Sequence, residues 1–294
     1  MKFPFLLLMS ILFCVSSCAQ DRFANVVITP HKLTDEVYML EGSGGNIGVV
    51  IEGQTAIMID DQYAPLSEKI KAAIQNLGVT EIKYVANTHW HGDHTGGNEN
   101  FAKEGAMIVA HENVRKRMGM ETTRGERTIP PSPELALPKF TFSKDFDLYH
   151  GSKHIKLIHV ENAHTDGDVL VWIPGSNVIH MGDCYFNKRF PYIDLDSGGS
   201  VNGAIRAIEA ALMIVDEDTQ IIPGHGPMAN KSDLQSYLKF LNTIKSRVYA
   251  QIADGKGIRD LDLKAIVSGY EEMGGGFIND ERLSQIFFNS LTQD

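Results

Sequence analysis

His89-Trp90-His91-Gly92-Asp93-His94 directly follows Ile82-Lys83-Tyr84-Val85-Ala86-Asn87, a short segment that is typical of a buried strand. The six residues hold three imidazoles and one carboxylate, which are ligands that zinc prefers. In a turn, alternate side chains can converge on one metal ion while the next pair points to a second. Because the end of a strand is a favoured place for sites in α/β sheets, the stretch predicts a metal site there.

The order His-x-His-x-Asp-His resembles the signature of the metallo-β-lactamase superfamily, which includes zinc β-lactamases, glyoxalase II-type thioesterases and lactonases. Three further segments occur in the order that this family implies. They are His164-Thr165-Asp166-Gly167, Gly182-Asp183 and Pro223-Gly224-His225-Gly226. The resemblance spans about residues 35 to 240.

The resemblance implies seven ligands and two Zn²⁺ ions, with iron as the alternative metal. The first ion is expected at His89, His91 and His164, and the second at Asp93, His94 and His225, with Asp183 between them. Two zinc ions that share a water lower its pKa from about 16 toward neutrality, so the implied nucleophile is a hydroxide that attacks a carbonyl carbon. Asp93 is also the candidate catalytic residue, which steers this nucleophile or delivers a proton.

Asp183 and Cys184 compete for the late ligand position in this scheme. Zinc β-lactamases of subclass B1 place a cysteine there, whereas Gly-Asp followed by Tyr-Phe resembles the thioesterases and lactonases. Because side chains alternate along a strand, only one of the two can face the metal ions, and we expect Asp183. In that same subclass a nearby lysine holds the substrate carboxylate. Lys188 and Arg189 lie close to this position at a different spacing, and they are candidate substrate contacts together with Asn202.

The hydrophobic pattern predicts an α/β fold in which a β-meander and helices occur twice. In the first half, strands are expected at 26–29, 37–40, 47–51 and 55–60, and a helix at 65–77. A polar, proline-containing loop is expected at 121–138, a second β-rich half from Phe140, and helices at 201–215 and 231–252. This order fits the four-layer αββα sandwich of the metallo-β-lactamase type, with two similar β-meander/helix halves.

The first residues have the order of a secretory signal. Lys2 precedes the apolar run from Phe3 to Val15, and Val15-Ser16-Ser17-Cys18 resembles a bacterial lipobox, with an ordinary cleavage near Ala19 as the alternative. We therefore expect a lipoprotein signal peptide at 1–17, lipidation of Cys18, a linker at 18–25, the metallo-β-lactamase-like domain at 26–253 and a peripheral helical extension at 254–294. The protein is expected to face the periplasm of a bacterium. It is expected to be attached to the outer membrane through its lipid alone.

The formal net charge of -10 argues against a nucleic-acid partner, because such proteins need a basic surface. The expected partner is a small molecule with a hydrolysable carbonyl. Export would bring the protein into contact with β-lactam antibiotics, so opening of a cyclic amide is the leading expectation. A lactonase or thioesterase, an iron-dependent oxidoreductase and a binding-only protein are the alternatives. The loops at 42–45, 121–138 and 186–200 are expected to shape the pocket.

Overall fold

The computed structural model describes residues 22–124 and 127–293. The predicted signal peptide, the predicted lipidation site at Cys18 and the first part of the predicted linker lie outside the described residues. Among the helices that are described, none combines the length and the apolar character needed to cross a membrane.

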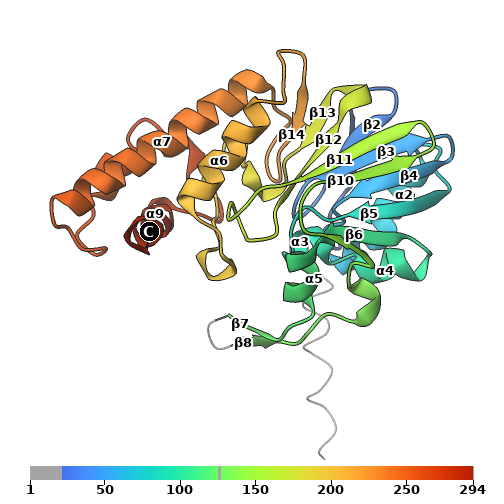
Figure 1. Ribbon diagram of the computed structural model, residues 1–294, viewed down its shortest axis with the longest axis horizontal. Coiled ribbons are helices and arrows are strands. Elements are labelled where there is room, and N and C mark those ends of the chain that lie inside the picture. The colour runs from blue at the N-terminus through green and yellow to red at the C-terminus, as the bar shows by residue number, and fades with distance from the viewer. Residues whose placement is uncertain (1–21, 125–126, 294) are drawn as a thin grey trace, which may run out of the picture.

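Two sheets form the centre of the molecule (Figure 1). The larger has seven strands in the order β1-β2-β3-β4-β5-β6-β9, and the smaller has five in the order β10-β11-β12-β13-β14. The strands of the larger sheet are β1 (Thr29–Lys32), β2 (Val37–Glu41), β3 (Ile47–Glu52), β4 (Thr55–Ile59), β5 (Glu81–Ala86), β6 (Met107–His111) and β9 (Phe140–Phe142). Those of the smaller sheet are β10 (Phe146–His150), β11 (Lys153–His159), β12 (Val169–Ile173), β13 (Val178–His180) and β14 (Gln220–Ile222).

Each sheet begins as an antiparallel meander and ends in parallel strands. In the larger sheet β1 to β4 are antiparallel neighbours, whereas β5, β6 and β9 add in parallel. In the smaller sheet β10 to β13 are antiparallel and β14 adds in parallel to β13. The two halves therefore repeat one architecture, as the sequence pattern predicts.

Strand alternation divides the apolar residues between an inner and an outer layer. On β4, Ile57 and Ile59 pack against the other sheet, whereas Met58 faces the helices. On β12, Val171 packs between the sheets and Leu170 faces outward. The sheets thus share one apolar core, and a further core lies under the helices on each side.

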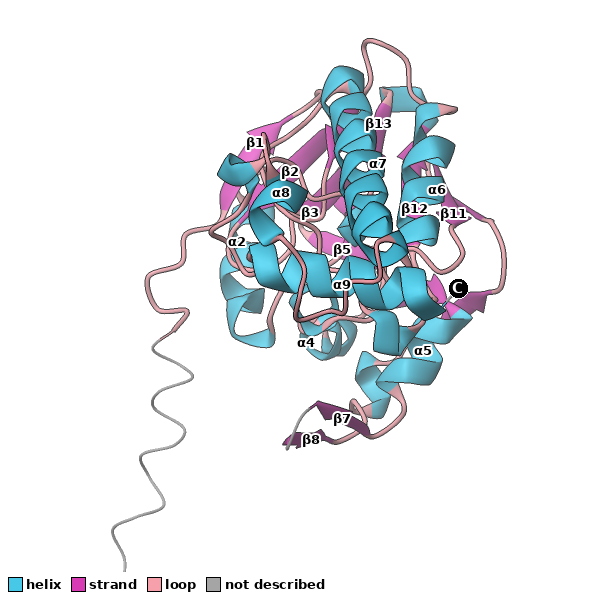
Figure 2. Cartoon of the chain, turned by 90° about the vertical axis from the view of Figure 1, so that its left-hand side faces the viewer, coloured by secondary structure: helices cyan, strands magenta, loops and turns pink. Residues whose placement is uncertain are grey.

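Helices cover both outer faces, which completes the αββα sandwich and confirms the predicted fold class (Figure 1). Figure 2 shows the helices that cover the smaller sheet from the front. On the larger sheet, α2 (Ser67–Gln75) and α4 (Asn98–Lys103) contribute Ile70, Ile74 and Phe101 to the outer core. On the smaller sheet lie α6 (Val201–Leu212), α7 (Lys231–Ala253), α8 (Leu263–Val267) and α9 (Asp280–Gln293). The remaining helices are α3 (Gly92–Thr95), α5 (Glu112–Met118) and short 3-10 turns at Ala64–Leu66, Glu134–Ala136, Pro174–Ser176, Gly182–Cys184, Leu195–Ser197 and Glu271–Met273.

Two strand predictions are wrong in their details. The first strand begins at Thr29 and not at Val26, because Lys69 donates hydrogen bonds to the carbonyls of Ala24 and Val26, and the chain there needs no strand partner. Phe140–Phe142 belongs to the first half, where β9 pairs with β6, so the second half begins at β10.

The expected loop at 121–138 contains a small hairpin, β7 (Thr122–Arg124) and β8 (Arg127–Ile129). The hairpin extends away from the sandwich below α5 (Figure 1). Its strands contain threonine and isoleucine, β-branched residues that favour extended backbone. The prolines at 130, 131 and 133 follow the hairpin and end this local pairing.

Candidate metal centre

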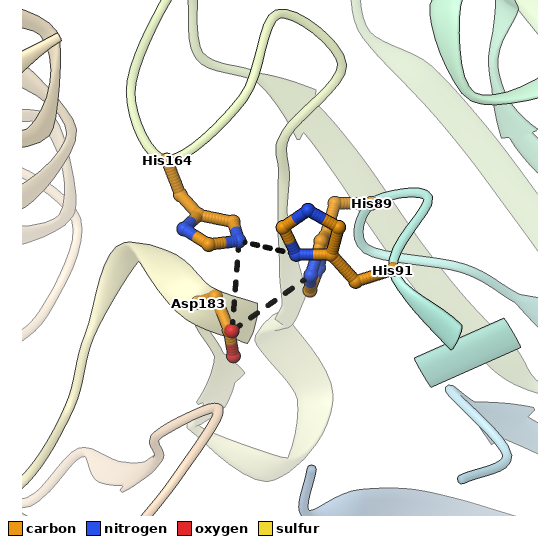
Figure 3. Close-up of side chains that lie close together, drawn as sticks. All are labelled: His89, His91, His164 and Asp183. Atoms are coloured by element: carbon orange, nitrogen blue, oxygen red, sulfur yellow. Dashed lines mark hydrogen bonds and ion pairs between the residues drawn. The ribbon is translucent and has the colours of Figure 1, made fainter. Parts of the chain in front are cut away.

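The first ligand group consists of His89, His91, His164 and Asp183, whose ligand atoms all lie within 4.8 Å of one another. His89 and His91 follow β5, His164 lies in the turn between β11 and β12, and Asp183 lies in the 3-10 turn after β13. Figure 3 shows the three imidazoles and the carboxylate turned toward a common point. All four residues are buried.

His89 presents an unprotonated nitrogen to this point. Thr88 Oγ1 donates its hydrogen to Asp60 Oδ2 at 2.8 Å, so it can only accept from His89 Nδ1, which lies 3.0 Å away. The proton of the neutral imidazole is therefore on Nδ1. The lone pair of Nε2 faces inward, as metal binding requires.

The same reasoning applies to His91 and His164. His91 Nε2 donates to Asp194 Oδ2 at 2.8 Å, and His164 Nδ1 donates to the carbonyl of Tyr192 at 2.7 Å. Their inward nitrogens, His91 Nδ1 and His164 Nε2, lie 2.9 Å apart (Figure 3). When both rings are neutral, two lone pairs face each other, and a cation between them removes this repulsion.

The second ligand group consists of Asp93, His94 and His225. Asp93 and His94 belong to α3, and His225 follows β14. His94 Nδ1 donates to Asp60 Oδ2 at 2.7 Å, which leaves Nε2 for a metal ion. The side chains of Asp93 and His225 are 23% and 19% exposed, so this group opens to solvent on one side.

Asp183 joins the two groups through its two oxygens. Oδ1 lies 3.1 Å from His94 Nε2 and 3.3 Å from His225 Nε2, while Oδ2 lies 3.8 Å from His89 Nε2 and 3.6 Å from His164 Nε2. One carboxylate therefore faces both groups, which is the position that a bridging ligand takes.

The residues present fit a pair of metal ions. Three buried polar atoms of the two ligand groups make no hydrogen bond. They are His89 Nε2, His94 Nε2 and Asp183 Oδ1. Buried polar atoms without a partner carry a large desolvation cost, and metal coordination removes it. The mixed imidazole and carboxylate donors suit zinc.

The electrostatics differ between the two groups. Burial lowers the pKa of His89 well below its ordinary value and that of His91 to about 4, so these rings are neutral. Burial acts in the same direction on His225, but Asp183 and Asp93 outweigh it and raise the pKa to about 9. Although burial opposes it, the imidazolium of His94 together with that of His225 lowers the pKa of Asp93 to about 2.

Cys184 is turned away from the ligands. Its side chain is buried in the apolar core under α6 and α7, and neither ligand group includes it. Burial raises the pKa of the thiol well above its ordinary value, so it stays protonated. Of the two neighbours that compete for the late ligand position, Asp183 is the one that faces the histidines.

Asn46 fixes the loop that carries His225 and contacts the strand that leads to Asp183. Its backbone N–H donates to the carbonyl of Gly224 at 2.7 Å, and its side-chain amide donates to the carbonyls of Pro223 and Gly226. His180 Nε2 in turn donates to the carbonyl of Asn46 at 3.0 Å. One residue just before β3 thus ties the first half to the loop of His225 and to the end of β13.

Glycine is required where the loops approach the ligands most closely. A Cβ on Gly45 would lie 2.1 Å from the ring of His94, and a Cβ on Gly224 would lie 2.2 Å from Asp183 Oδ1. Both distances are far below a possible contact, so a side chain at either position would displace a ligand.

Beside the metal centre lies a cavity of about 1000 Å³, into which Asp93, Asp183 and His225 open. Of the three candidate substrate contacts, Arg189 lines the cavity, whereas Lys188 and Asn202 are not among its lining residues. Its aromatic lining includes Tyr63, Trp90, Phe186, Phe190 and Tyr192.

Several contributors lie outside the metal-ligand motifs of the sequence. Asp194 and the carbonyl of Tyr192 orient His91 and His164 from a loop far along the chain. The segment Met273–Ile278, which we expected to be peripheral, forms part of the cavity wall. Asp168 accepts hydrogen bonds from the backbone and hydroxyl of Thr165, so it stabilises the turn that carries His164.

The comparisons with known proteins agree with this geometry. The model of the metallo-β-lactamase superfamily matches residues 40–238. Hydroxyacylglutathione hydrolase of Rhodospirillum rubrum is 26% identical over 231 residues, which cover 78% of this chain and 77% of that protein. A probable metallo-hydrolase of Bacillus subtilis is 25% identical over 203 residues, which cover 67% of this chain and 95% of the relative.

A solved structure, a metallo-β-lactamase from Pontibacter korlensis, has the same fold with a TM-score of 0.61. The identity is 19%, and the match covers 73% of this chain and 99% of that one.

The fold and the site define an αββα protein with two adjoining groups of histidine and aspartate ligands at the ends of its strands. The chain belongs to the metallo-β-lactamase superfamily, as the sequence motifs predict. The broad class of its activity is that of a metal-dependent hydrolase.

Proposed function

We propose that the chain is a dizinc hydrolase that cleaves a thioester or a lactone. The observation that carries this proposal is the place of Asp183, which lies between both ligand groups while Cys184 packs in the core. A set of metal ligands that consists only of histidine and aspartate resembles the ligand pattern of thioesterases and lactonases. The similarity to a hydroxyacylglutathione hydrolase over most of both chains supports the same substrate class.

Two zinc ions at these groups would supply a water of lowered pKa as nucleophile and would polarise the carbonyl that it attacks. The residues of the chain provide the geometry. Asp194 and Asp60 hold His91 and His94 in the orientation that turns one nitrogen inward. Asp93 lines the cavity and stays ionised, so it accepts a hydrogen bond and orients the nucleophile.

Arg189 is the candidate contact for a negatively charged group of the substrate. Three arginines line the cavity. Arg22 lies over the ring of Tyr63, and Arg117 donates to both carboxylate oxygens of Asp166 at 2.6 and 2.7 Å. Among the described residues, Arg189 makes no hydrogen bond or ion pair. We expect Arg189→Ala to raise the Michaelis constant for anionic substrates and to leave that for uncharged ones unchanged.

A β-lactam is the second candidate substrate. The predicted signal peptide favours it, because an exported enzyme meets these antibiotics outside the cytoplasm. The same ligand set would attack the carbonyl of a strained cyclic amide.

The test is a substrate panel on the purified protein, with metal content measured by mass spectrometry. A glutathione thioester, an acyl-homoserine lactone and nitrocefin are assayed with and without chelator. We expect two zinc ions per chain and turnover of the thioester or the lactone, lost with chelator and restored by zinc. Faster turnover of nitrocefin would favour the second candidate. Full occupancy by iron would instead support the oxidoreductase alternative, and no turnover of any compound would overturn all three substrates.

We also propose that the mature protein is exported and anchored through a lipid on Cys18. The sequence Val15-Ser16-Ser17-Cys18 supports this, and it lies outside the described residues. Growth with a fatty-acid analogue should label the wild-type protein in the membrane fraction. Loss of the label in Cys18→Ala, with the protein still exported, is the expected result, and an unlabelled wild type would contradict it.

A further inference from the structure

Three exposed apolar side chains lie at the wall of the cavity beside the metal centre. They are Met120, Ile129 and Phe277, which are 54%, 36% and 74% exposed. Met120 precedes the β7–β8 hairpin, Ile129 is the last residue of β8, and Phe277 belongs to the C-terminal segment. Large apolar groups in water are unfavourable, so their gathering around one cavity points to a ligand that covers them.

Phe277 is held in place despite its exposure. The guanidinium of Arg282 lies 4.2 Å from the centre of its ring, and the ring of Tyr192 meets it edge-on at 5.9 Å. Ile278, the next residue, is buried in the core under the helices. The contacts fix the ring at the cavity wall, so a ligand that packs on it does not have to order it first.

The segment that carries Phe277 is also connected to the metal centre. The backbone N–H of Phe190 donates to the carbonyl of Met273 at 3.2 Å, which joins the segment to the loop at 186–200. In that loop Tyr192 stacks on His91 at 5.9 Å and accepts the hydrogen bond of His164. The apolar wall and the ligands therefore belong to one continuous surface.

We propose that Met120, Ile129 and Phe277 form an apolar subsite that binds the alkyl or aryl arm of the substrate while its carbonyl lies at the metal centre. This inference rests on the proposed hydrolase function, since that function places the substrate in this cavity. The substrate class that follows is an amphipathic thioester or lactone, with an apolar arm on this wall and a polar or anionic part toward Arg189.

The test measures binding of a series of straight-chain carboxylates, from butanoate through hexanoate and octanoate to decanoate, to the zinc-loaded protein by calorimetry. A carboxylate resembles the product of carbonyl hydrolysis, and the head group is the same throughout the series. The increase in affinity with chain length therefore reports the apolar subsite alone. We expect up to about fourfold tighter binding for each added methylene in the wild type.

Phe277→Ser and Met120→Ser are expected to reduce this increase per methylene to about half or less. Both residues are exposed, so neither substitution threatens the fold. Met213→Ser and Tyr249→Ser are the matched controls, since these residues are 89% and 61% exposed and do not line the cavity, and the dependence on chain length should stay unchanged in both.

Two results would overturn the subsite. The first is a wild type whose affinity does not depend on chain length, and the second is an unchanged dependence in both Phe277→Ser and Met120→Ser. The alternative occupant of the wall is a second copy of the chain, and sedimentation tests it. A monomeric wild type excludes this occupant, whereas a dimer that Phe277→Ser dissociates would show that a second copy covers the wall. A normal chain-length dependence with no turnover of any panel substrate would instead contradict the proposed function and leave the subsite standing.

Discussion

The two ligand groups differ in burial and in charge. His89, His91 and His164 are almost completely enclosed, and burial keeps the first two neutral. Asp93 and His225 face the cavity, and the carboxylates of Asp183 and Asp93 keep His225 protonated when no metal is bound. The first group is therefore arranged to hold a metal ion, and the second to exchange contacts with substrate and solvent.

The difference suggests a division of labour between the two positions. An ion at the enclosed group meets neutral rings at His89 and His91 and is largely shielded from solvent. An ion at the open group must displace a proton and remains accessible through the cavity. We expect the open group to lose its ion first when a chelator is added.

The largest expected effect comes from Asp183, the residue that both groups share. Asp183→Asn keeps the shape of the side chain and removes the charge that faces His94 and His225. We expect the turnover of the active panel substrate to fall by at least about 100-fold, with loss of metal from both groups. Activity together with two tightly bound zinc ions in this variant would contradict a bridging role.

The groups can be weakened to different extents through the residues that orient them. Asp194→Asn acts on His91, whereas Asp60→Asn acts on His94 directly and on His89 through Thr88. Asp194→Asn should lower the zinc affinity of the enclosed group by about 10- to 100-fold, and Asp60→Asn should lower that of both groups. Competition with a chromogenic chelator measures both affinities, and an unchanged enclosed group in Asp194→Asn would contradict the orienting role of Asp194.

Acidification should affect the open group more strongly. The pKa of His225 is raised to about 9, so this ring carries a proton below that pH and must release it on metal binding. The pKa of His91 is lowered to about 4, so protons do not compete for it at neutral pH. Between pH 8 and pH 6 the zinc affinity of the open group should fall by up to about tenfold per unit for each proton displaced.

Titrations with zinc across this pH range measure the expected difference. Buffers of different ionisation enthalpy also report the number of protons released. Parallel loss of affinity at the two groups would show that they do not differ in protonation.

The smallest expected effect is that of Cys184→Ala. The side chain packs in the core and belongs to neither ligand group, although it contacts the backbone of His164, so metal content and turnover should change little. The free energy of unfolding should fall by about 1 kcal/mol, because a buried sulfur is lost. Denaturant unfolding measures this change, and a lost zinc ion would place Cys184 among the ligands after all.

The sequence predicts the ligands better than their surroundings for a physical reason. His89, His91, Asp93 and His94 occur within six residues, so their spacing alone indicates convergence on metal ions. The supports come from afar, since Asp194 is separated from His91 by 103 positions and the acceptor for His164 is a backbone carbonyl, which has no signature. Only the fold brings these groups together.

The sequence pattern does not predict the wall of the cavity either. Phe277 follows three glycines in a segment that resembles an ordinary surface loop, and nothing in its spacing relates it to Tyr192. Likewise, the pairing of β9 with β6 depends on tertiary packing, because Phe140–Phe142 is a strand by its composition in either half. Local pattern thus determined the elements, and long-range contacts determined their partners.

The ligands are divided between the halves of the sandwich, with His89, His91, Asp93 and His94 from the first and His164, Asp183 and His225 from the second. Bound metal therefore cross-links the two halves, and only the folded chain brings the ligands together to bind it. The melting temperature becomes a function of free zinc, since a ligand at about a hundredfold excess over its Kd stabilises the folded state by about 2.7 kcal/mol. In a compartment where zinc is scarce, the same chain would be both less active and shorter-lived.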